Sequence, residues 1–249
     1  MKINHAILLS ILCLLSSASA TIISPQSVIS EEYVYRSAEK AIDGSGLSTT
    51  LNTGASLSTA LSTTHIYNTG WDKSFVSSNK GADFFANLGT DTDLDIVLDL
   101  TNGGDIDFQS VLLWQYQYNG GNANKMTGND LRTLEIRINT EAEGSSTFSA
   151  TPDATVTMLP VLDGDTDDTN DLGGINSAQK YALGSQHGRY ALISITDNYY
   201  GLNGITIGGD RVGLGEIRFA TETVVPEPAA YLLVLFCSGG FLLTRRLFA

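Results

Sequence analysis

The chain has 249 residues, with 27 acidic and 14 basic side chains and a formal net charge of −13. This balance argues against nucleic acid as a partner, because phosphate binding needs clustered cations. It suits a soluble exported protein and leaves divalent cations as possible partners. The two cysteines, Cys13 and Cys237, lie in apolar terminal segments. The sequence between them therefore excludes thiol catalysis and zinc sites built on cysteine.

Residues 1–20 predict a secretory signal peptide. Lys2 supplies the positive start, residues 6–15 form the apolar core, and Ala18-Ser19-Ala20 provides a small-residue cleavage site. Cys13 lies inside the apolar core and follows Leu12, where a lipoprotein signal would have a small residue. We therefore expect cleavage and export without a lipid anchor at this end.

Residues 21–221 are long enough for one domain with a sizeable core. Apolar and polar residues alternate along 94–100, 134–138, 191–195 and 216–219, and residues 106–116 form a further apolar strand. Glycine-rich and asparagine-rich turns separate these stretches. Short antiparallel strands of this kind predict an all-β jelly-roll β-sandwich, with one short helical turn near residues 30–38.

Two long loops interrupt the predicted strands. Residues 45–64 are uncharged and rich in Ser, Thr, Gly and Leu, which predicts a surface insertion. Residues 163–176 begin with an acidic run that resembles a calcium loop. An EF-hand is not expected, because Asp168 stands where glycine is needed and Gly174 where a bidentate glutamate belongs. A solvated acidic loop is favoured over an irregular cation site.

After a short linker at 222–225, the last segment, 226–249, begins with Pro226-Glu227-Pro228. An uncharged apolar run over 229–244 follows, and it is short for a bilayer span, which needs about 20 residues. Arg245 and Arg246 close the run and should stay in the cytoplasm, so the body of the chain would lie outside. These features predict a short transmembrane helix, and an ordinary C-terminal anchor is one interpretation.

The order of Pro-Glu-Pro, short apolar span and terminal arginines resembles the PEP-CTERM sorting signal of Gram-negative bacteria. This resemblance implies recognition by an exosortase at the inner membrane and removal of the tail. It also implies delivery to the cell surface or to an extracellular polysaccharide matrix.

A second resemblance covers most of residues 38–219. The chain is similar to the discoidin, or factor V/VIII C-type, group of galactose-binding-like jelly rolls. Five stretches occur in the expected order: Ala41-Ile42-Asp43-Gly44, 94–100, 105–114, 189–193 and 213–217. Two features depart from the pattern: the expected tryptophan is the displaced Trp71, and Thr101-Asn102 replaces a glycine turn.

This resemblance implies a structural Ca²⁺ ion held by Asp43 and Glu216, with Ser48 as a further oxygen ligand. Calcium takes 6–8 oxygen ligands, and Gly44 and Gly46 would let the chain fold around the ion. The alternative is an Asx-type turn at Asp43 with an exposed Glu216.

Aromatic residues near predicted loop ends are the candidates for sugar binding, because a sugar ring stacks on an aromatic face. Trp114 is expected in the core. The predicted ligand-binding residues are Trp71, Tyr118, Asn119 and Tyr200.

No catalytic motif is present, and the two histidines of the predicted domain, His65 and His187, lie in unrelated contexts. Pairs of carboxylates are not diagnostic in so acidic a chain. We therefore expect a non-enzymatic carbohydrate-binding module that binds exopolysaccharide. The alternatives are a structural surface or matrix protein without a specific ligand, and a polysaccharide hydrolase.

Overall fold

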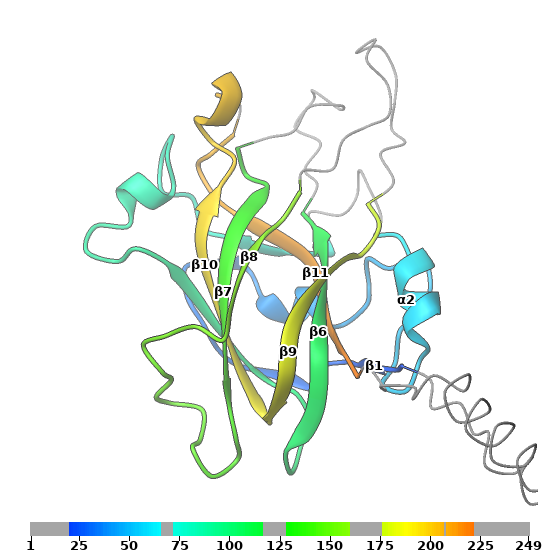
Figure 1. Ribbon diagram of the computed structural model, residues 1–249. Helices are drawn as coiled ribbons and strands as arrows, with labels where there is room; N and C mark the ends of the chain where they lie inside the picture. Colours follow the sequence, from blue (N-terminus) through cyan, green and yellow to red (C-terminus); the bar gives the residue numbers. More distant parts are fainter. Residues whose placement is uncertain (1–19, 66–71, 117–127, 160–175, 207, 222–249) are drawn as a thin grey trace, which may run out of the picture. The chain divides into compact units, whose positions relative to one another are not determined.

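The computed structural model describes residues 20–65, 72–116, 128–159, 176–206 and 208–221. Within these ranges, eleven strands form two antiparallel sheets (Figure 1). The six-stranded sheet has the order β3 (Val34–Arg36), β4 (Phe75–Ser77), β11 (Gly213–Ala220), β6 (Ile106–Gln115) and β9 (Gln179–Gly188), with β1 (Ile22–Ile23) also paired to β11. The five-stranded sheet has the order β2 (Ser27–Glu31), β5 (Leu94–Asp99), β10 (Tyr190–Asn198), β7 (Leu131–Asn139) and β8 (Ala154–Thr157).

Short helical segments connect the strands. They are η1 (Ala38–Ala41), α2 (Leu57–Ser62), η3 (Phe85–Asn87) and η4 (Leu202–Gly204).

The alternation of apolar residues matches the strands of the structure. Leu94, Ile96 and Leu98 of β5 are buried in the main core, and the inward residues of β7, β10 and β11 join the same cluster. Because side chains alternate between the two faces of a strand, this pattern assigns one face of each sheet to the core. The predicted all-β class is confirmed, and the two antiparallel sheets match a jelly-roll sandwich.

Two local features differ from the sequence-based expectation. Residues 30–38, expected to hold a helical turn, are mostly strands β2 and β3, and the helical turn lies at Ala38–Ala41. β9 was not expected, because most of its residues are exposed or half-buried and apolar alternation is absent. Its pairing with β6 also contains a register shift, and Gly184 adopts a φ of 72°. Such a bulge breaks the period that identifies a strand.

The insertion at 45–64 does more than lie on the surface. It contains α2, whose first turn is capped by Ser56 through a bond from the Thr59 N–H. Its apolar side chains pack on the outer face of the six-stranded sheet, and α2 lies beside that sheet (Figure 1). Trp114 is core, as expected, and its indole N–H donates to the Thr63 carbonyl at 2.9 Å. We call this group the outer cluster: Ile22, Leu47, Leu51, Ala60, Leu112, Trp114 and Ala220.

The first and last strands of the domain lie side by side. The Thr221 N–H donates to the Thr21 carbonyl at 2.9 Å, and the Thr21 N–H donates to Thr221 Oγ1 at 3.0 Å. The predicted signal peptide, except Ala20, and the linker and sorting segment at 222–249 lie outside the described residues. In the part of the chain that the structure describes, no helix is long and apolar enough to span a membrane.

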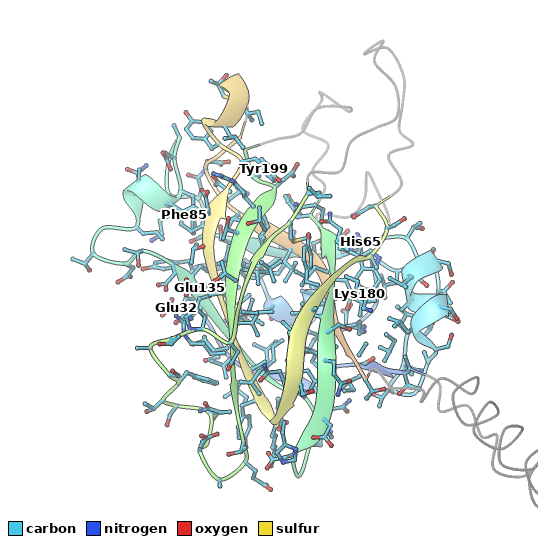
Figure 2. The ribbon with its side chains drawn as sticks, in the orientation of Figure 1. Glu32, His65, Phe85, Glu135, Lys180 and Tyr199 are labelled. Atoms are coloured by element: carbon cyan, nitrogen blue, oxygen red, sulfur yellow. The ribbon has the colours of Figure 1, made fainter. Side chains whose placement is uncertain are left out.

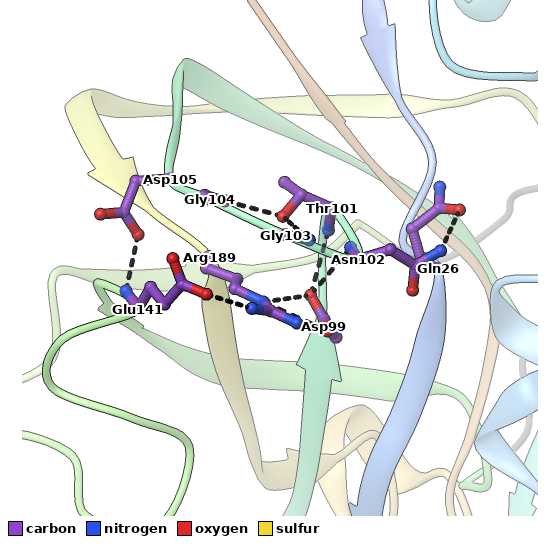
Figure 3. A network of polar contacts seen from close by, with 9 residues as sticks. All are labelled: Gln26, Asp99, Thr101, Asn102, Gly103, Gly104, Asp105, Glu141 and Arg189. Atoms are coloured by element: carbon purple, nitrogen blue, oxygen red, sulfur yellow. Dashed lines mark hydrogen bonds and ion pairs between the residues drawn. The ribbon is translucent and has the colours of Figure 1, made fainter.

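A polar network joins the end of β5 to the start of β10 (Figure 3). Arg189 Nη2 donates to Asp99 Oδ2 at 2.7 Å, and Arg189 Nη1 donates to Glu141 Oε1 at 2.6 Å. Asp99 Oδ1 also accepts the N–H groups of Thr101 at 3.1 Å and Asn102 at 3.3 Å. Burial by itself would raise the pKa of Asp99, but the bonds from Arg189 and Thr101 outweigh it and lower that pKa from 3.8.

We expect Asp99→Asn to lower the melting temperature at pH 7 by about 5 °C, because Arg189 loses the more buried of its two carboxylate partners and keeps only the exposed Glu141. The lowered pKa means that this stabilisation is complete above pH 3.8 and disappears as the pH falls through the lowered value. The difference between variant and wild type should therefore shrink in acid. Thermal unfolding between pH 2 and 7 measures it, with the exposed Asp72→Asn as control. A constant difference across this range would contradict the assignment.

Candidate functional site

A groove of about 600 Å³ lies on the outward face of the five-stranded sheet. Strands β2, β5, β7 and β10 contribute to its lining, and the loop at residues 145–150 forms another part of it. Figure 2 labels Glu32 of the lining, which directly follows β2, and Glu135 of β7. The charged and hydroxyl side chains in the lining include Glu32, Asp93, Asp95, Arg137 and Ser194.

Strand register brings part of this lining into a hydrogen-bonded row. Ser194 of β10 lies opposite Asp95 of β5 and Glu135 of β7. Ser194 Oγ donates to Asp95 Oδ1 at 2.6 Å and accepts from Arg137 Nη1 at 3.1 Å. Arg137 Nη2 donates to Glu135 Oε2 at 2.6 Å. The four side chains hold one another in place across three strands, which fixes the polar groups before any ligand arrives.

An apolar surface adjoins this row. Leu192 lies opposite Val97 and Arg137 in the strand register, and both apolar side chains line the groove while remaining largely buried. Phe148, in the loop that lines the groove, is half-buried. The groove can therefore accept hydrogen bonds through carboxylates, donate them through Arg137 and pack against the apolar face of a ligand.

The carboxylates of the groove are crowded. Burial raises the pKa of Glu32 above 4.5, and the negative charges of Asp95, Asp91 and Asp93 add to this effect. Burial also raises the pKa of Asp93 above 3.8, with Asp95 as the next cause and Arg137 in opposition. Their ionised forms are thus less stable here than in water, a pattern that is common at functional sites.

We expect Glu32→Gln to raise the melting temperature at pH 7 by about 1–2 °C, because it removes a repelled charge from a partly exposed position. A raised pKa in the folded state destabilises the fold above that pKa and has no effect below the unfolded value of 4.5. The gain should therefore disappear below about pH 4.

Calorimetry at pH 7 and below about pH 4 measures the melting temperature of Glu32→Gln against the wild type. Glu143→Gln is the matched control, because its carboxylate accepts bonds from Thr140 and its pKa is lowered. No gain is expected from it. A gain for Glu143→Gln, or none for Glu32→Gln at pH 7, would contradict the electrostatic account.

The predicted calcium ligands Asp43 and Glu216 are close enough to interact, and Arg218 stands with them. Burial raises the pKa of Glu216, the guanidinium of Arg218 opposes this, and the charge of Asp43 adds to it. Glu216 is fully buried, in contrast to the exposed position of the alternative interpretation. Its Oε1 forms an ion pair with Arg218 Nη1.

The oxygen atoms of Asp43 and Ser48 expected to bind a metal already have other partners, whereas Glu216 Oε2 is buried without a hydrogen bond. Asp43 Oδ1 accepts the Ser45 N–H at 2.8 Å, and Asp43 Oδ2 accepts from Lys40 Nζ at 3.0 Å. Ser48 Oγ accepts the Thr64 N–H at 3.0 Å. Among the described residues, no group of three or more His, Cys, Asp and Glu side chains is placed to hold a metal ion. The assignment of a calcium ion to Asp43, Ser48 and Glu216 therefore stays a prediction.

Of the predicted ligand-binding residues, the structure describes only Tyr200, which does not line the groove. Trp71, Tyr118 and Asn119 lie outside the described residues, as does the acidic run at 163–171. Tyr200 is half-buried, and it packs so closely on Gly128 and Gly209 that neither position has room for a side chain. In this place Tyr200 covers a glycine-rich loop.

Comparison with known proteins gives distant likenesses. No family model and no curated protein matches the chain. The F5/8 type C domain of a Bacteroides fragilis protein is 16% identical, covering 83% of this chain and 99% of its own, with a TM-score of 0.47. The family 32 CBM of C. perfringens NanJ, solved in complex with galactose, is 14% identical, covering 81% and 98%, with a TM-score of 0.40. The lectin domain of lectinolysin, complexed with Lewis B antigen, is 13% identical, covering 81% and 95%, with a TM-score of 0.40. Likenesses of this size assign neither a family nor a ligand to the chain.

Proposed function

We propose that this chain is an exported, non-catalytic glycan-binding protein whose ligand lies in the groove of the five-stranded sheet. One observation carries the proposal. An apolar surface made by Val97 and Leu192 adjoins the fixed polar row of Asp95, Ser194 and Arg137.

A sugar ring has one apolar face and a rim of hydroxyl groups. The apolar face can pack on Val97 and Leu192, while ring hydroxyls donate to carboxylates and accept from the guanidinium of Arg137. Because the polar row is already connected, little side-chain entropy is lost on binding.

The charge of the groove narrows the class of glycan. Glu32, Asp93 and Asp95 face a single cation in the lining, Arg137, among the residues that the structure describes. The chain as a whole also carries a net charge of −13. A polyanionic glycan would be repelled, so neutral or amine-bearing glycans fit best.

We expect Arg137→Met to weaken glycan binding at least about 10-fold. The variant loses one charge-assisted hydrogen bond to the glycan and the bond that holds Ser194 in place. The matched control is Arg132→Met on the same strand, since Arg132 pairs with Asp197 and does not line the groove. Calorimetric titration of the full chain would use galactan, chitosan and alginate oligosaccharides as neutral, amine-bearing and anionic probes. Alginate should bind least.

The result would also separate the other functions. No binding to any of the three probes would favour a structural matrix protein without a specific ligand. Equal losses in Arg137→Met and Arg132→Met would place the ligand outside the groove.

A polysaccharide hydrolase is a second candidate, because Glu32 and Asp93 combine raised pKa values with a place in one groove. Release of new reducing ends, lost in Glu32→Gln, would support it.

We further propose that the chain is exported through the inner membrane of a Gram-negative bacterium and sorted by an exosortase. The support is the sequence order of a signal peptide at 1–20 and, at the other end, Pro226-Glu227-Pro228, an apolar run and Arg245-Arg246. Its destination would be the cell surface or the exopolysaccharide matrix.

We expect protein recovered from the cell surface to lack the peptide that contains residues 231–236, because the sorting enzyme removes the tail. Mass spectrometry of tryptic and chymotryptic digests measures this. Replacing both Pro226 and Pro228 by alanine should leave the tail attached and the protein in the membrane fraction. Surface protein that retains residues 231–236 would contradict this sorting route.

A further inference from the structure

Two charged side chains are buried on the outward side of β11. Glu216 is 0% exposed and Arg218 is 2% exposed, whereas Ile217 and Phe219 of the same strand belong to the main core. Since neighbours along a strand face opposite sides, Glu216 and Arg218 project away from the main core. The outer cluster, to which residues 47–60 contribute, lies on that side of the sheet.

The guanidinium of Arg218 lies against the Asp43-Gly44 turn as well as against Glu216. Arg218 Nη1 pairs with Glu216 Oε1 and donates to the Ile217 carbonyl at 2.7 Å. A Cβ atom on Gly44 would lie 3.3 Å from Arg218 Nη2, and Gly44 has a φ of 70°. Glycine at this position lets the turn approach the guanidinium closely and adopt a conformation that other residues resist.

The charges of this group balance without a metal. The carboxylates of Asp43 and Glu216 supply two negative charges, and Arg218 and Lys40 supply two positive ones. Burial lowers the pKa of Arg218, and the negative charges of Glu216 and Asp43 only partly offset this effect. Arg218 therefore interacts with Asp43 as well as with Glu216. A divalent cation here would have to displace a buried guanidinium and leave it without a partner, which is costly.

We infer that the guanidinium of Arg218 is a built-in cation that joins the Asp43-Gly44 turn to Glu216, in the place where the sequence resemblance implies a calcium ion. The packing of the Asp43-Gly44 turn on β11 then needs no divalent cation. The inference concerns the opposite sheet from the groove and does not depend on glycan binding.

The first test needs no variant. Thermal unfolding of the full chain is followed in excess EDTA and in excess CaCl₂. A native calcium site would shift the midpoint by roughly 5–10 °C at saturation, whereas we expect a change below about 1 °C. A shift of the larger size that disappears in Asp43→Asn would overturn the inference. A shift that persists in Asp43→Asn would locate the ion elsewhere and leave the role of Arg218 standing.

The second test removes the internal cation. Arg218→Met should lower the midpoint by about 10 °C, because Glu216 is left as an uncompensated buried charge. Arg211→Met is the matched control, since Arg211 pairs with Asp210 near the surface, and a change below about 2 °C is expected.

The double variant Glu216→Gln/Arg218→Met should recover most of the loss, because it removes both charges together. It also keeps the test decisive if Arg218→Met does not fold. Recovery supports the pairing. A single variant Arg218→Met as stable as wild type, or a double variant no better than Arg218→Met, would overturn it.

Discussion

The structure depends on the burial of β11 on both faces. All eight residues of this strand are buried, because the main core covers one side and the outer cluster lies on the other. A strand placed in this way cannot hold a charge that lacks a partner. The pairing of Glu216 with Arg218 follows from this constraint. Residues 45–64 are needed for the same reason. Without their apolar side chains, Trp114 on the neighbouring strand would be exposed to water.

The sequence predicts strands that show polar–apolar alternation or, as in β6, a continuous apolar run, and it fails where neither signal is present. The alternation in β5 and β7 identifies both strands and their core faces, because one side is polar and the other apolar. β9 carries no such contrast. Residues 45–64 read as a surface loop because their apolar residues are widely spaced, yet Leu47, Leu51 and Ala60 pack together in three dimensions. Spacing along the chain does not reveal this kind of burial.

The candidate sites show the same division. Motif order alone associates Asp43 with Glu216, and the structure shows their charges interacting. Arg218 was not recognised as their third member, since an arginine in a strand normally reads as an exposed partner of the alternation. The groove was also missed. Asp95, Ser194 and Arg137 come from three strands, and only their register brings them into one row. Register between distant strands is not visible in a single sequence.

The meeting of the two ends at β1 and β11 has a mechanical consequence. If the domain hangs from its C-terminal end, tension enters through β11, which is bonded to β6 over most of its length and to β1 and β4 on its other side. A pull along the strand loads these hydrogen bonds in parallel, so they must break together and not one after another. A tether at an edge strand would unzip far more readily. β11 is thus bonded along both edges, and a pull along its axis meets these bonds at the same time.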